Sequence, residues 1–307
     1  ARMMLGDTGI ATSALGFGCA HLFREPSRSA RARLIDRALD AGIVHFDVAP
    51  MYGLGAAEAE LGRLLRGRRD GVVVATKFGI EPTRRARALA PLQGVLARLG
   101  ARRGRADARA GAVGSALYRS GLYAAADARA SLERSLRALR TDHVDLLLVH
   151  DPPPGVTVGG ELRDALEHLQ ADGLVRAWGV AGEMALAAGG DDAPRVLQLP
   201  GDLFSRPAAL RRPAILYGVV SRALPPLARH LQAEDVRRRW SDALGADAGR
   251  DAVIGTLLLR DALDAATGPV LVGTTQPARI DAAAAAAASP AGDDLDAFRA
   301  LVAEVPR

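Results

Sequence analysis

Residues 72–79, VVVATKFG, form an apolar run of strand length that ends in a charged side chain. A run this continuously apolar is typical of a strand buried on both faces, as in a parallel sheet covered by helices. Lys77 closes the run, and it is the only lysine in a chain with 40 Lys plus Arg residues. Arg holds a charge equally well, whereas only Lys offers a compact ammonium whose pKa burial can tune. Either Lys77 has a function that Arg cannot fill, or it survives by chance at a strand end.

The same pattern recurs along the chain, where apolar runs alternate with segments of helical periodicity. In residues 29–42, Leu34, Ile35 and Ala38 share one helical face, and Gly42 is placed to end the helix. Eight strand–helix units in 307 residues favour a single (β/α)8 TIM barrel, of class α/β, over an open doubly wound sheet. The helices after the fifth and sixth strands are weakly marked. The expected strands are 15–19, 43–49, 71–77, 143–150, 174–180, 195–200, 214–220 and 269–273, and the clearest helices are 29–42, 55–67, 128–140 and 160–173.

One segment interrupts this alternation. Residues 80–127, between the third strand and its helix, are rich in Arg and Gly, and we expect them to form a long inserted loop or lid within one domain spanning 1–307. Two interpretations stay open: a lid that favours an anionic or bulky substrate, or a solvated surface. The arginines concerned are Arg84, Arg85, Arg87, Arg102, Arg103 and Arg105.

Composition narrows the class of partner. The net charge of +5 comes from scattered Arg, without the basic and aromatic interleaving of single-strand nucleic-acid binders, so we expect a small-molecule partner and no nucleic acid. Cys19 is the single cysteine, which excludes an intrachain disulfide and fits a reducing compartment. No apolar segment approaches eighteen residues. We therefore expect a cytoplasmic protein without membrane contact, as a monomer or weak homo-oligomer, with no metal site.

Reactive groups of a (β/α)8 barrel lie where its strands end, at the C-terminal face. Three neighbouring expected strands deliver Asp47, Lys77 and His150 to that rim, and Tyr52 follows in the loop after Asp47. Singly, each residue has an ordinary structural explanation, such as a helix cap or a satisfied loop histidine. Together, in this strand order, they predict a catalytic group.

Proton donation to a carbonyl oxygen needs this combination of side chains. A phenol is a poor acid–base group at neutral pH, and an adjacent ammonium lowers its pKa by favouring the phenolate. Lys77 can be that ammonium, and a buried ammonium needs a carboxylate partner, which Asp47 supplies. His150, if neutral, can hydrogen-bond the substrate oxygen and stabilise the developing alkoxide.

At these residues the chain resembles the aldo-keto reductase superfamily. The matching segments are FDVAPMYGLGAAEAELGRLL, VVVATKFG, LERSLRALRTDHVDLLLVHDP, ALEHLQADGLVRAWGV and PVLVGTTQPARI, in order across nearly the whole chain. The resemblance implies a nicotinamide cofactor bound without a Rossmann domain, and hydride transfer with Tyr52 as general acid. Thr274 and Arg279 match positions that hold an adenosine 2′-phosphate, which implies NADP(H). The implied cofactor-binding residues are Gly18, Asp47, Gln198, Tyr217, Ser221, Gly273, Thr274 and Arg279.

The sequence departs from the family pattern around the nicotinamide. Ala181 and Gly182 stand where the family has Ser-Asn to hold the carboxamide, which predicts a loosely held ring or another anchor. Tyr217, or alternatively Val220, takes the place of the Tyr that stacks on the ring. The usual Glu and Asn near the adenine fall on two alanines, Ala282 and Ala283.

Several functions fit this site. The first is NADP(H)-dependent reduction of an aldehyde or ketone to an alcohol. The same chemistry run oxidatively would make a sugar (aldose) dehydrogenase, and the sequence does not decide the direction. A Schiff-base aldolase with Lys77 as nucleophile is a third possibility, and a cofactor-sensing subunit without turnover is a fourth.

Overall fold

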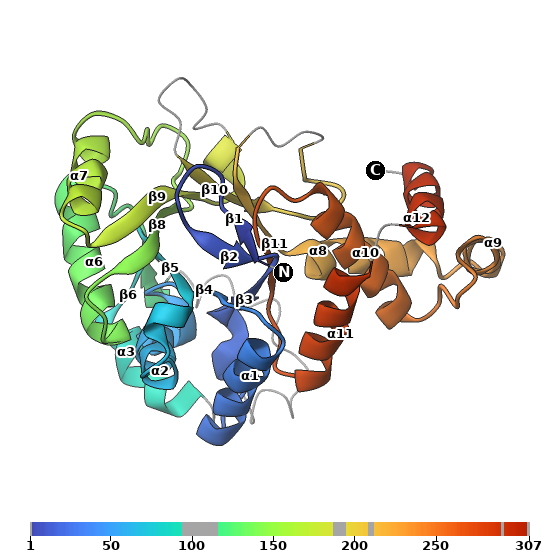
Figure 1. Ribbon diagram of the computed structural model, residues 1–307, viewed down its shortest axis with the longest axis horizontal. Helices are drawn as coiled ribbons and strands as arrows, with labels where there is room; N and C mark the ends of the chain where they lie inside the picture. The colour runs from blue at the N-terminus through green and yellow to red at the C-terminus, as the bar shows by residue number, and fades with distance from the viewer. Residues whose placement is uncertain (1, 94–115, 187–194, 208–211, 290–291, 306–307) are drawn as a thin grey trace.

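The computed structural model describes residues 2–93, 116–186, 195–207, 212–289 and 292–305. Within them, eight parallel strands close into a barrel in the order β3-β4-β5-β8-β9-β10-β11-β12, which confirms the predicted (β/α)8 class (Figure 1). The strands are β3 (Leu15–Gly18), β4 (His45–Asp47), β5 (Val73–Phe78), β8 (Val144–His150), β9 (Val175–Ala181), β10 (Val196–Pro200), β11 (Ala214–Tyr217) and β12 (Val270–Val272).

Helices surround the barrel, with α1, α2, α6 and α7 on one side of Figure 1 and α8, α10 and α11 on the other. Helices α9 and α12 lie farther out, where the Trp240 and Phe298 rings meet edge to face at 6.1 Å. The helices are α1 (Arg28–Asp40), α2 (Ala57–Leu64), α6 (Ala125–Leu139), α7 (Gly160–Ala171), α8 (Val219–His230), α9 (Glu234–Leu244), α10 (Asp251–Ala265), α11 (Pro277–Ala288) and α12 (Asp293–Ala303).

Several expected boundaries were wrong, and two of them have a clear structural reason. The seventh strand ends at Tyr217 and not at 220, because Gly218 turns the chain at φ +71° and α8 begins at Val219. Helix α6 begins at Ala125 and not at 128, because the Asp127 carboxylate accepts a hydrogen bond from the Ala124 N–H and caps an earlier turn. The sequence pattern missed both features because neither involves an apolar side chain.

A hairpin formed by β1 (Arg2–Met4) and β2 (Ala11–Ser13) closes the N-terminal end of the barrel. Its turn inserts Leu5 and Ile10, both fully buried, among the inward-facing barrel residues Ala75, Leu146 and Ile215. The apolar plug leaves the opposite, C-terminal end as the place for a polar site.

The insertion after β5 has an ordered base. Strands β6 (Glu81–Pro82) and β7 (Tyr118–Arg119) pair antiparallel, and α3 (Arg84–Leu89) and a 3-10 turn, η4 (Ala90–Leu92), follow β6. The buried Glu81 carboxylate accepts hydrogen bonds from Ser131 and Arg134 of α6 and from Arg87. Residues 94–115, including Arg102, Arg103 and Arg105, lie outside the described residues, so the expected lid stays a prediction.

Candidate functional site

Lys77 lies at the centre of the C-terminal rim. Its side chain is 2% exposed, and its Nζ donates to both Asp47 carboxylate oxygens at 2.7 Å and to the Val48 carbonyl at 3.3 Å. Register explains the pairing, because β4 and β5 are neighbours and alternation turns Asp47 and Lys77 into the barrel. Gln198 of β10 donates its amide to the same carboxylate at 2.8 Å. Asp47 therefore receives hydrogen bonds from two sides of the closed barrel.

Tyr52 is placed over Lys77 by an unusual turn. The three residues after it, Gly53, Leu54 and Gly55, all have positive φ, at 56°, 54° and 92°. Leu54 is strained there, because only glycine adopts this conformation without cost. The turn brings the Tyr52 ring centroid to 5.1 Å from the Lys77 Nζ.

Packing from two other segments fixes this turn. A Cβ on Gly53 would lie 2.6 Å from the Phe23 ring of the 3-10 helix η1 (Cys19–Arg24), and one on Gly55 would lie 2.9 Å from Pro82 of β6. The Gln93 amide also donates to the Gly53 carbonyl at 3.0 Å. The base of the insertion thus packs directly on the loop that carries Tyr52.

Burial and charge act in opposite directions on this pair. Burial raises the pKa of Tyr52, and the Lys77 ammonium lowers it by less, so the phenol stays protonated above its ordinary range. Burial by itself would lower the pKa of Lys77, but the Asp47 carboxylate and the Tyr52 phenol more than reverse this and raise it. The sequence-based expectation of a lowered Tyr52 pKa omitted the burial of the phenol. At neutral pH the pair is therefore a protonated phenol beside an ammonium.

His150 ends β8 beside Tyr52. Their rings meet edge to face with centroids 6.1 Å apart, and the imidazole is 7% exposed. Burial, with a smaller contribution from the Lys77 charge, lowers the pKa of His150 to about 3. The ring is therefore neutral at physiological pH and can donate one hydrogen bond. The structure brings together all four predicted rim residues.

Sequence reasoning missed two residues at this rim, Tyr123 and Asp151. The Tyr123 hydroxyl donates to the carbonyls of His150, at 2.8 Å, and Asp151, at 2.9 Å. Asp151 has φ +44° and places its carboxylate beside His150. The sequence could have indicated Asp151 through its position directly after His150. Tyr123 lies in the insertion, where no sequence pattern indicates a functional role.

The expected phosphate-side residues gather at the ends of β3 and β12. Gly18 and Gly273 are close enough that a Cβ on Gly273 would lie 3.5 Å from the Gly18 carbonyl oxygen. The Thr274 hydroxyl accepts from the Gln276 N–H at 3.0 Å and so helps to begin α11. Arg279, in the first turn of α11, is exposed and makes no ion pair within the described ranges. A close backbone approach beside an unpaired guanidinium fits an anionic group such as a phosphate.

The expected nicotinamide-side residues differ more from the prediction. Tyr217 ends β11 at the rim, half-buried, whereas Val220 lies past the Gly218 turn in the first turn of α8, so Tyr217 is the better placed of the two. The Gln198 amide donates one of its two N–H groups to Asp47. Ser221 is exposed in the first turn of α8. At Gly182, with φ +129°, a Cβ would lie 2.1 Å from the Asp151 carboxylate, so an Asn side chain does not fit this backbone.

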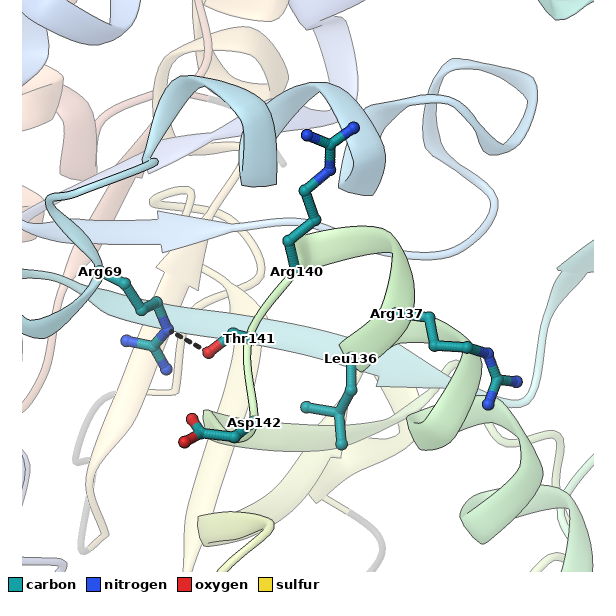
Figure 2. A pocket seen from close by; sticks show the side chains of 6 residues that line it. All are labelled: Arg69, Leu136, Arg137, Arg140, Thr141 and Asp142. Atoms are coloured by element: carbon teal, nitrogen blue, oxygen red, sulfur yellow. Dashed lines mark hydrogen bonds between the residues drawn. The ribbon is translucent and has the colours of Figure 1, made fainter.

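A surface hollow elsewhere on the molecule carries no comparable chemistry. It lies at the N-terminal ends of β5 and β8, opposite the rim, and Figure 2 shows Arg137 and Arg140 pointing apart across it. Arg69 is committed to Thr141 and Asp145. Within the described residues no cluster of His, Cys, Asp or Glu could hold a metal ion. No helix there has the length and apolar character needed to cross a membrane.

Comparison with known proteins agrees with this geometry. A model of the aldo/keto reductase family matches residues 14–187. The D-threo-aldose 1-dehydrogenase of a Pseudomonas species is 33% identical over 183 residues, which cover 56% of this chain and 50% of that protein. The 6-dehydroglucose reductase of Agrobacterium fabrum is 36% identical over 150 residues, 48% of this chain and 41% of that protein. The chain thus matches about half the length of these relatives.

The fold comparison extends over the whole chain. The structure of an aldo-keto reductase from Bacillus halodurans, in its holo form, superimposes with a TM-score of 0.69 and covers 98% of this chain and 95% of that one. The two sequences are 21% identical in this alignment, so the likeness concerns the fold alone.

Proposed function

Because the chain belongs to the aldo/keto reductase family, we propose that it is an NADP(H)-dependent oxidoreductase that reduces an aldehyde or ketone to an alcohol. The observation that carries the proposal is the Lys77 ammonium, held by Asp47 at 2.7 Å and lying 5.1 Å from the Tyr52 ring centroid, with neutral His150 beside the phenol. These groups are what proton donation to a carbonyl oxygen requires.

Each side chain then has one role. A bound nicotinamide supplies the hydride to the carbonyl carbon. Tyr52 gives its phenolic proton to the carbonyl oxygen, and Lys77 stabilises the phenolate that remains. His150 donates a hydrogen bond to the same oxygen and so stabilises its developing charge. Asp47 keeps Lys77 protonated. The raised pKa of Tyr52 keeps the phenol in its acidic form at neutral pH.

The preference for NADP(H) rests on Arg279. Its guanidinium is exposed and has no carboxylate partner in the part of the chain that the structure describes, so it can pair bidentately with a 2′-phosphate, which NAD(H) lacks. Gly18 and Gly273 leave room for the pyrophosphate side, and Ser221, Thr274 and Tyr217 complete the proposed cofactor-binding set. Gln198 donates one amide N–H to Asp47, so it can still offer the cofactor its carbonyl oxygen and its second N–H.

Specific observations favour one alternative function, sugar oxidation, and disfavour another, the Schiff-base aldolase. The 33% identical relative is named D-threo-aldose 1-dehydrogenase, which favours sugar oxidation as the second candidate. In that direction Tyr52 must act as the phenolate, so the raised pKa predicts a rate that increases into the alkaline range. The Schiff-base aldolase is disfavoured, because its nucleophile is a neutral amine and Lys77 is buried, paired and held charged.

Replacing the Tyr52 hydroxyl tests the proposal. Tyr52→Phe should lower kcat for carbonyl reduction at least 100-fold while NADPH binding, followed by fluorescence, stays within a few-fold, since the lost interaction belongs mainly to the transition state. Tyr118→Phe, the same change in the insertion, is the matched control. A Tyr52→Phe variant that keeps more than about a tenth of the wild-type kcat would contradict the general-acid role. Borohydride trapping of substrate on Lys77 would instead support the aldolase.

A further inference from the structure

Asp151 is held in a strained conformation beside the proposed catalytic group. Its φ of +44° is rare for a residue other than glycine, although Asp adopts it more readily than most. Three hydrogen bonds maintain it: the Asp151 N–H donates to Ala181 O at 2.7 Å, and the Tyr123 hydroxyl donates to the carbonyls of His150 and Asp151. Strain that neighbouring groups maintain in this way is characteristic of functional sites.

Tyr123 is itself firmly fixed. Its ring lies over Gly79, where a Cβ would come within 2.1 Å of the ring, and the Leu122 N–H donates to the Gly79 carbonyl at 3.3 Å. Gly79 follows Lys77 by two residues at the end of β5. The end of the insertion therefore joins the strand that carries Lys77 to the strand that carries His150, and it fixes the direction of Asp151.

The Asp151 carboxylate faces the place where a substrate would react. One carboxylate oxygen lies 3.7 Å from the His150 Nε2, and the other lies over Gly182, which has no side chain to cover it. The Asp151 side chain is 54% exposed. Within the described residues its carboxylate accepts no hydrogen bond, so its acceptor capacity is open to a ligand.

Among the described residues, the positive charges near Asp151 are already paired. Lys77 is bound to Asp47, and Arg222 bridges Asp202 and Glu183, each at 2.9 Å. His150 is neutral at physiological pH. Within the described part of the chain the Asp151 carboxylate thus adds a negative charge that no cation compensates, which favours hydroxyl donors and disfavours anionic groups.

We propose that Asp151 is a specificity-determining residue whose carboxylate accepts a hydrogen bond from a hydroxyl group next to the reacting carbonyl. A substrate whose carbonyl oxygen meets His150 Nε2 brings a neighbouring hydroxyl within reach of an acceptor 3.7 Å from that nitrogen. The site then selects uncharged hydroxyaldehydes and hydroxyketones, the class of open-chain sugars, over anionic carbonyls. This inference rests on the proposed carbonyl reduction.

Two pairs of related aldehydes test it. Glycolaldehyde and propionaldehyde differ by a hydroxyl in place of a methyl group, and succinic semialdehyde differs from butyraldehyde mainly by its carboxylate. Asp151→Gly removes the acceptor and tolerates φ +44°, and Asp151→Asn removes only the charge. Glu183→Gln is the control, because it neutralises a nearby carboxylate that is already paired with Arg222.

In Asp151→Gly, the ratio of kcat/KM for glycolaldehyde to that for propionaldehyde should fall about 10- to 100-fold, as expected for a lost hydrogen bond to a charged group. In Asp151→Asn, the ratio for succinic semialdehyde to butyraldehyde should rise several-fold, and Glu183→Gln should change neither ratio. Thermal melting and NADPH fluorescence confirm that each variant folds and binds the cofactor. A merely structural role would lower kcat/KM for all substrates together.

Different results would overturn the role of Asp151 and the proposed carbonyl reduction. If wild-type protein reduces propionaldehyde with NADPH but both ratios stay within two-fold in the Asp151 variants, the role of Asp151 is overturned and the proposed function stands. If Asp151→Gly instead weakens NADPH binding and leaves the ratios unchanged, Asp151 serves the cofactor, and the inference is equally overturned. Wild-type protein that reduces none of the four aldehydes contradicts the proposed function, and the inference falls with it.

Discussion

Removing the Lys77 ammonium should destabilise the fold more than removing both charges of its ion pair. The Lys77 and Asp47 side chains are 2% and 4% exposed, so water does not replace a lost partner. In Lys77→Met, the Asp47 carboxylate loses two hydrogen bonds of 2.7 Å and keeps the one from Gln198. Leaving one member of a buried ion pair unpaired costs about 3–5 kcal/mol, and Asp47→Asn should cost a similar amount because it strands the ammonium.

The double variant Lys77→Met/Asp47→Asn should recover much of this loss, because no uncompensated charge remains. We expect a coupling energy of about 2–3 kcal/mol, the upper part of the range for residues in direct contact. Urea denaturation of the cofactor-free proteins, followed by the fluorescence of the buried Trp178 and Trp240, gives the four free energies of unfolding. All three variants should also lose carbonyl reduction.

The pH dependence checks the same reasoning independently. The folded-state pKa of Lys77 is raised above its ordinary 10.5, so its stabilisation is complete below that value and is lost as pH rises through the folded pKa. Wild-type stability should therefore fall in this alkaline range more steeply than that of Lys77→Met. Single-variant costs that add to within about 0.5 kcal/mol in the double variant would refute the paired-charge account.

Three further predictions concern other parts of the chain. Arg279→Ala should weaken NADPH binding at least ten-fold more than NADH binding in parallel fluorescence titrations, and equal weakening would give Arg279 a structural role. Burial lowers the pKa of His45 to about 4, from an ordinary 6.5, so the unfolded chain binds more protons in acid. Between pH 7.5 and 5, His45→Leu should therefore lose about 2 kcal/mol less stability than wild type in urea titrations. Gly182→Asn should lower the thermal midpoint and weaken NADPH binding, because residue 182 has φ +129° and a Cβ there would clash with Asp151. Ala181→Ser is the control and should be tolerated. Tighter NADPH binding by Gly182→Asn would instead support a nicotinamide ring that is loosely held in the native site.

The sequence by itself determined the barrel and its rim. Continuous apolar runs such as 72–75 indicate burial on both faces, and burial of this kind in eight helix-separated strands leaves few architectures other than a closed parallel sheet. Because parallel strands all end at one face, the positions of Asp47, Lys77 and His150 at strand ends were sufficient to bring them together. Tyr52 followed from its place in the adjoining loop.

Only the tertiary structure decided what surrounds these residues. The bond from Gln198 to Asp47 joins positions 151 residues apart, and Tyr123 reaches the His150 carbonyl from within the insertion. The Asp151 carboxylate fills the space that an Asn at 182 would need. Neither the periodicity nor the composition of the sequence indicates these contacts, because a hydrogen bond between distant segments depends on the direction of the backbone in the closed barrel. Local sequence patterns indicate which residues are buried. The hydrogen-bond donors and acceptors of a site depend instead on which loops lie next to one another in the folded barrel.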